Sequence, residues 1–155
     1  MKKILLACIL SVSLWAAEHN VYSVTFNAPI DKVENNMLTK FQAENLVVAW
    51  QLDILDEFNK RGLVKKLGDK YNTGKLSNVR TLVACNGMIG NDIMNADPTM
   101  MAYCPIRITL TEKDGKTTVL YVRPTSAPKD SKAYPHLVKL EKKVTKAIED
   151  SMEME

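Results

Sequence analysis

The clearest structural signal in the sequence is a pair of alternating segments joined by a short turn. Ile106–Glu112 and Thr117–Arg123 alternate apolar and polar side chains, and between them lies Asp114-Gly115 with a lysine on each side. An Asp-Gly pair suits the positive φ angles of a tight hairpin turn. Slipping a strand by one residue would turn its apolar side chains toward solvent, so the alternation also fixes the register. The sequence therefore predicts an antiparallel hairpin and a fold built on a β-sheet.

Strand and helix patterns alternate through the rest of the chain. Apolar, β-prone runs predict strands at residues 21–26, 46–52 and 79–84. Apolar positions three and four residues apart predict a helix after each strand, and Asp53 is expected to cap the second helix. A long amphipathic helix is expected at the C-terminus. The stripes are Ile30, Val33, Met37, Leu38 and Phe41; Ile54, Leu55 and Phe58; Ile89, Ile93 and Ala96; and Leu137, Leu140, Val144, Ile148 and Met152.

This order of elements favours the α+β class. We expect a two-layer sandwich, with a mixed or antiparallel sheet, a C-terminal hairpin and a long C-terminal helix packed on one face. A chain of 155 residues without repeats or linkers is expected to form one domain, here residues 17–155.

The first 16 residues have the pattern of a secretory signal peptide. Lys2 and Lys3 precede an apolar stretch that ends at Trp15, and cleavage is expected after Ala16 or Ala17. The apolar stretch is shorter than the roughly 20 residues that span a bilayer, which argues against a retained anchor. We expect the protein in the periplasm or secreted, with no membrane span after processing.

Removing the leader also changes the charge of the chain. The full sequence has 21 Lys and Arg against 18 Asp and Glu, and the leader holds two lysines and no acid, which leaves 19 against 18. No basic stripe with interleaved aromatic residues remains. Nucleic acids are therefore not expected as partners, because their binding depends on neutralising phosphates.

Two cysteines, Cys85 and Cys104, remain after the leader is removed. An oxidising compartment would permit a disulfide that closes a loop of about 20 residues and stabilises the fold by about 3 kcal/mol. Two free thiols are the alternative, because the sequence does not show whether the side chains meet. Cys85 also lies where a strand leads into a helix, a position that can activate a thiol, although no CxxC motif is present.

Sulfur-containing and histidine residues give three metal hypotheses. Met88, Met94, Met100 and Met101 lie between the two cysteines. These thioethers and the sulfurs of Cys85 and Cys104 could together provide soft ligands for Cu(I), although methionines also fill cores. His136 or a methionine could be an axial ligand of haem. Cleavage after Ala16 would expose Ala17-Glu18-His19, an N-terminal pattern that can hold Cu(II) or Ni(II). Zinc is disfavoured, since neither CxxC nor HxxxH occurs.

Several motifs in this sequence resemble the domain of unknown function 302 family. They are Cys85-Asn86-Gly87, Asn95-Ala96-Asp97-Pro98, the run from Ala102 to Ile108 that contains Cys104-Pro105, and Tyr121-Val122-Arg123-Pro124. The resemblance covers nearly the whole mature chain and is closest to an exported subgroup with this Cys and Cys-Pro arrangement. It implies a small α+β domain that forms a homodimer, and it carries over no catalytic residue.

The sequence therefore predicts an exported, non-catalytic binding or accessory module whose functional surface is the segment from Cys85 to Cys104. Its ligand is unknown, with copper or haem as candidates. The alternative is a periplasmic thiol–disulfide redox protein that uses Cys85 and Cys104. Neither a Gly-x-Ser-x-Gly motif nor a phosphate-binding glycine loop is present to favour a hydrolase or a nucleotide-binding protein.

Overall fold

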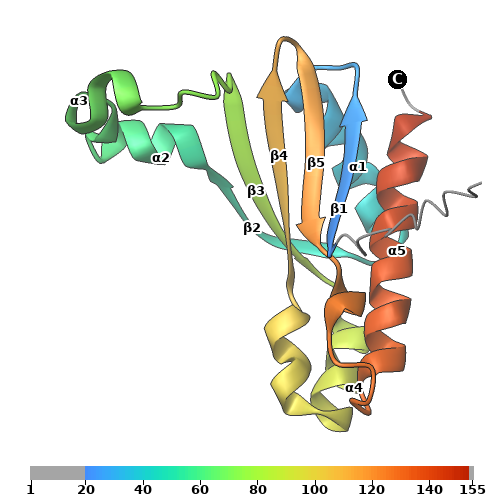
Figure 1. The fold of residues 1–155 in the computed structure, drawn as a ribbon. Coiled ribbons are helices and arrows are strands. Elements are labelled where there is room, and N and C mark those ends of the chain that lie inside the picture. The colour runs from blue at the N-terminus through green and yellow to red at the C-terminus, as the bar shows by residue number, and fades with distance from the viewer. Residues whose placement is uncertain (1–19, 154–155) are drawn as a thin grey trace, which may run out of the picture.

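A computed structural model describes residues 20–153 of the chain. Its centre is a five-stranded sheet in the order β1-β5-β4-β3-β2, and every neighbouring pair is antiparallel (Figure 1). The predicted α+β class is confirmed, and the sheet is antiparallel rather than mixed. The strands are β1 (Val21–Phe26), β2 (Val47–Asp53), β3 (Asn78–Cys85), β4 (Ile106–Lys113) and β5 (Lys116–Val122).

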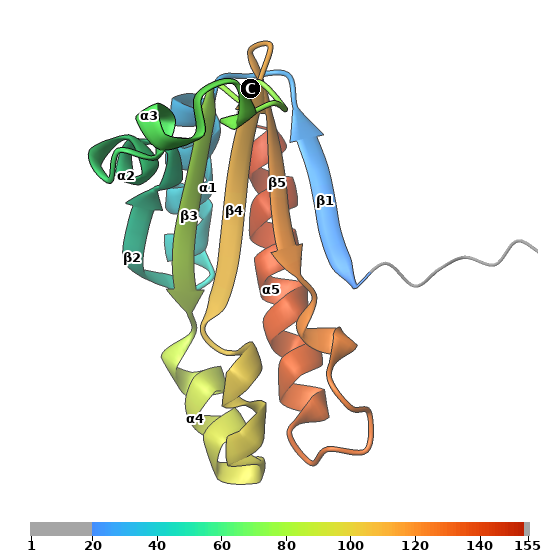
Figure 2. The ribbon, with the colours of Figure 1, turned by 60° about the vertical axis from the view of Figure 1, so that its left-hand side comes forward.

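Two helices, α1 (Ile30–Ala43) and α5 (Tyr134–Met152), cover one face of the sheet (Figure 2). The predicted stripe of α5 explains its position, because Leu137, Leu140, Val144 and Ile148 are all buried against the sheet and α1. Met152, the last residue of that stripe, is exposed. α1 begins after Pro29, which is its N-cap.

The predicted hairpin is present, with Asp114 and Gly115 both at positive φ and Lys113 paired with Lys116. Its even-numbered β4 side chains, such as Ile108 and Leu110, point into the core. The odd-numbered ones face the opposite side of the sheet, which no helix of the described residues covers (Figure 2). Large apolar side chains are therefore exposed there and along the sheet edges: Val21, Val47, Trp50 and Val122.

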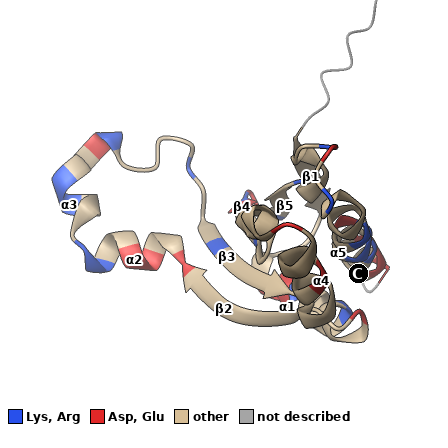
Figure 3. Ribbon diagram, turned by 90° about the horizontal axis from the view of Figure 1, so that it is seen from below, with Lys and Arg blue, Asp and Glu red and all other residues tan. Residues whose placement is uncertain are grey.

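An arm projects from the sheet between the C-terminal end of β2 and the N-terminal end of β3 (Figures 1 and 3). It consists of α2 (Ile54–Lys60), α3 (Leu63–Leu67) and a short 3₁₀ helix (Gly68–Lys70). Asp53 caps α2 as predicted, accepting a hydrogen bond of 2.9 Å from the amide of Asp56. The predicted apolar stripe does not reach the core, since none of the residues of α2 or α3 is buried. The physical reason is that β2 is an edge strand, and α2 continues beyond the sheet.

The predicted leader, residues 1–16, and the Ala17-Glu18-His19 metal site lie outside the described residues. Among the helices that are described, none combines the length and apolar character needed to cross a membrane.

Candidate functional site: a thiol pair at the end of the sheet

The structure brings together Cys85 and Cys104, whose Sγ atoms are 2.9 Å apart. Cys85 is the last residue of β3, and Cys104 lies two residues before β4. Because β3 and β4 are antiparallel neighbours with Ala84 opposite Ile106, the end of one strand meets the start of the other. The chain between them forms α4 (Gly87–Ala96) and a 3₁₀ helix (Pro98–Tyr103) beyond the end of the sheet (Figure 1). The antiparallel pairing thus brings together two cysteines that are 19 residues apart in the sequence, without a CxxC motif.

The two thiols differ in their access to solvent. Cys104 is 1% exposed and belongs to the core, whereas Cys85 is half-buried. Burial, followed by the hydrogen bond with Cys85, raises the pKa of the Cys104 thiol to about 12. Cys104 therefore stays protonated at neutral pH, and Cys85 is the more exposed residue of the pair.

Gly90 of α4 packs against both sulfurs. A Cβ atom at this position would lie 3.2 Å from Sγ of Cys85 and 3.6 Å from Sγ of Cys104. The first distance is closer than ordinary van der Waals contact. The helix can approach the thiol pair this closely because residue 90 has no side chain.

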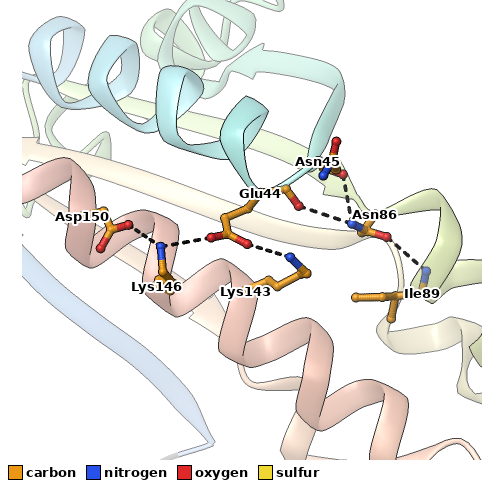
Figure 4. Close-up of polar contacts among 7 residues, drawn as sticks. All are labelled: Glu44, Asn45, Asn86, Ile89, Lys143, Lys146 and Asp150. Carbon is orange, nitrogen blue, oxygen red and sulfur yellow. Dashed lines mark hydrogen bonds and ion pairs between the residues drawn. The ribbon is translucent and has the colours of Figure 1, made fainter.

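Asn86, directly after Cys85, fixes the start of α4. Its Oδ1 accepts a 3.1 Å hydrogen bond from the amide of Ile89, which makes it the N-cap. Its Nδ2 donates to the carbonyl oxygens of Glu44 and Asn45, at 3.3 and 3.1 Å (Figure 4). Asn86 is 5% exposed, and its buried side chain forms hydrogen bonds to both segments. It connects the loop between α1 and β2 to the helix beside the thiols.

Glu44 extends this connection to α5. Its carboxylate lies 2.6 Å from Nζ of Lys143 and 3.0 Å from Nζ of Lys146, and Lys146 also contacts Asp150 (Figure 4). The hydrogen bonds from the two lysines lower the pKa of Glu44 below its ordinary value. The end of α1, the start of α4 and the middle of α5 are therefore held as one unit around the site.

The predicted metal and haem ligands are spread over this end of the molecule. Met88 is 80% exposed, Met94 and Met101 are also exposed, and Met100 packs partly against the core. His136 lies in the first turn of α5, with Nδ1 3.6 Å from Oδ2 of Asp92 in α4. In the part of the chain that the structure describes, no three His, Cys, Asp or Glu side chains are grouped to hold a metal ion. The copper and haem hypotheses stay predictions.

The roles of Asn86 and Gly90 in the site could not be predicted in full from the sequence. The sequence places Asn86 at a strand-to-helix junction, where asparagine is a favoured N-cap, so that part of its role was open to prediction. Its bonds to Glu44 and Asn45, and the contact of Gly90 with the sulfurs, arise only from tertiary packing.

Comparisons with known proteins agree with this fold. The sequence profile of a family described as domain of unknown function DUF302 matches residues 22–151. A crystal structure of an uncharacterised conserved DUF302 protein from Bacillus stearothermophilus has a TM-score of 0.71 and 15% sequence identity, and covers 85% of this chain and 98% of that chain. No curated protein matches the chain. At this identity the structural likeness shows the fold alone.

Proposed function

The chain belongs to the DUF302 family of domains of unknown function, so its activity has to be argued from its own residues, and we propose that it is a thiol–disulfide module. In this proposal Cys85 and Cys104 interconvert between a dithiol and a disulfide. The observation that carries it is the 2.9 Å separation of the two sulfur atoms. Little movement is needed to reach the bond length of about 2.05 Å in a disulfide.

The unequal exposure of the two sulfurs supports a reactive pair rather than a wholly structural one. Burial of both sulfurs protects a structural disulfide from reduction, whereas here Cys85 is only half-buried. Reactive cysteines combine solvent access with a buried partner that resolves the mixed disulfide. Cys85 has the position of the attacking sulfur and Cys104 that of the resolving one.

The chemistry balances with a disulfide of a partner protein or of a small thiol as the oxidant. The Cys85 thiolate attacks the partner disulfide, forms a mixed disulfide and releases one partner thiolate. The Cys104 sulfur then attacks Cys85, gives its proton to the leaving sulfur and releases the second partner thiol. The pair loses two electrons and the partner gains them, and the reverse sequence reduces the protein.

Export and self-association are part of the same proposal. The leader pattern at residues 1–16 directs the protein to a compartment where disulfides form. The exposed Val47 and Trp50 on edge strand β2 support a homodimer, since exposed apolar edge strands tend to pair with another chain. Intact mass of the exported protein under native conditions measures both the cleavage site and the number of subunits.

The experiment compares single-cysteine variants of the chain beginning at Ala17, which lacks Cys8. Cys104→Ser retains the accessible sulfur, and we expect it to form a stable mixed disulfide with glutathione disulfide. Cys85→Ser retains the buried sulfur, and we expect little adduct over the same time. Circular dichroism of both variants serves as the folding control. Equal adduct formation by the two folded variants would contradict the assigned roles.

A further inference from the structure

A second site is indicated on the helix-free face of the sheet. There β1, β5 and the start of β4 form the floor of a hollow of about 580 Å³. This volume falls within the range of about 300 to 1,000 Å³ that small-molecule sites occupy. Its walls are largely apolar, with Val21, Pro105, Leu120 and Val122 among the lining residues.

One charged side chain lines the hollow. Arg107 lies between Ile106 and Ile108 on β4, and because those two are buried, its side chain points to the opposite face. Within residues 20–153 the guanidinium has no acidic partner, although the other arginines of the sheet region, Arg80 and Arg123, each pair with a carboxylate. Thr109, two residues further along β4, faces the same hollow and adds a hydroxyl group.

We propose that this hollow binds a small organic acid: one carboxylate attached to an apolar chain or ring. The carboxylate pairs with the guanidinium of Arg107, whose planar fork matches its two oxygens. The apolar body lies against Val21, Leu120 and Val122. A lone cation among apolar walls favours one negative charge with a hydrophobic body over a polyanion, which would leave further charges unpaired.

The site is independent of the thiol chemistry. Cys104 points into the core, whereas the residues on either side of it, Tyr103 and Pro105, line the hollow. A ligand would therefore contact the segment that carries the buried sulfur without reaching the sulfur itself. Binding is expected in both the dithiol and the disulfide form, so a failure of the thiol proposal leaves this one testable.

The test titrates the protein with decanoate while amide NMR shifts are recorded. Decanol and decyltrimethylammonium, which have the same alkyl chain without the negative charge, are the matched ligands. We expect saturable binding of decanoate, shifts centred on Tyr103, Arg107 and Leu120, and affinities at least about tenfold lower for the other two ligands.

Arg107→Gln removes the charge and keeps much of the stem, and we expect it to reduce decanoate affinity to that of decanol. Arg61→Gln, an arginine on the projecting arm, is the matched control and should bind as the parent does. Because Arg107 and Arg61 are both exposed, both variants should fold. The proposal is overturned if decanoate does not saturate, if the three ligands bind equally, or if Arg107→Gln binds decanoate unchanged.

Discussion

The two ends of β3 show how differently one strand can be used. At its C-terminal end lie the thiol pair, the N-cap Asn86, which connects the loop between α1 and β2 to α4, and α4 itself packed against α5. The N-terminal end of β3 follows the arm, whose helices α2 and α3 bury no residue (Figure 3). The polar contacts of α2 are local: its N-cap Asp53 and ion pairs such as Lys60 with Asp56. Secondary structure is regular at both ends. Tertiary burial distinguishes them, and we place the function where burial fixes the side chains.

The largest expected difference between the two ends concerns apolar side chains. Ile93 of α4 is fully buried, so Ile93→Ala removes packed atoms and leaves a cavity, at a cost of about 2 to 4 kcal/mol in the free energy of unfolding. Leu67→Ala on the arm, where the side chain is exposed, should change it by less than about 1 kcal/mol. Urea unfolding measures both. Similar losses would show that the arm is packed in solution and would remove the contrast.

The two N-caps provide the next comparison. Asn86→Ala removes the cap of α4 and also the donor of the hydrogen bonds to the carbonyls of Glu44 and Asn45, so we expect a loss of about 2 kcal/mol. Asp53→Ala removes only the cap of α2, and about 1 kcal/mol or less is expected. Chemical denaturation checks the order of the two values. An equal loss would mean that Asn86 acts only as a cap.

A smaller effect is expected from acid. Because its lysine partners lower the pKa of Glu44 in the folded state, this group stabilises the fold above its ordinary value of 4.5, and the contribution is lost as the pH falls through the lowered value. Glu44→Gln should therefore lower Tm at pH 7 and show a weaker fall in Tm on acidification. Glu57→Gln, which removes an exposed partner of Arg61 on the arm, is the control and should change Tm little. Parallel acid profiles of the Glu44 variant and the parent would contradict the account.

Much of the fold could be predicted from the sequence because the governing signals are local. The alternation around Asp114-Gly115 identifies the hairpin, and the stripe from Leu137 to Ile148 identifies the helix that covers the sheet. The arm was harder to foresee. Ile54, Leu55 and Phe58 form the pattern of a helix packed on a core, but strand order decides whether a core is within reach, and strand order is not a local property.

The site was predictable only in part, for the same reason. Sequence reasoning identified Cys85 and Cys104 and left open whether they meet, since the answer depends on the pairing of β3 with β4. Arg107 lies within the run from Ala102 to Ile108, but that motif assigns it no role. It becomes a candidate only when the structure shows that, among the described residues, no helix covers one face of the sheet and no acidic side chain pairs with its guanidinium.

The measurement that tests the central claim most directly is a redox titration of the chain beginning at Ala17 in glutathione buffers, followed by intact mass after alkylation of free thiols. We predict a single two-electron transition between a dithiol and an internal Cys85–Cys104 disulfide. Two alkylated thiols at every buffer ratio, or a disulfide that no buffer reduces, would contradict a reversible thiol pair.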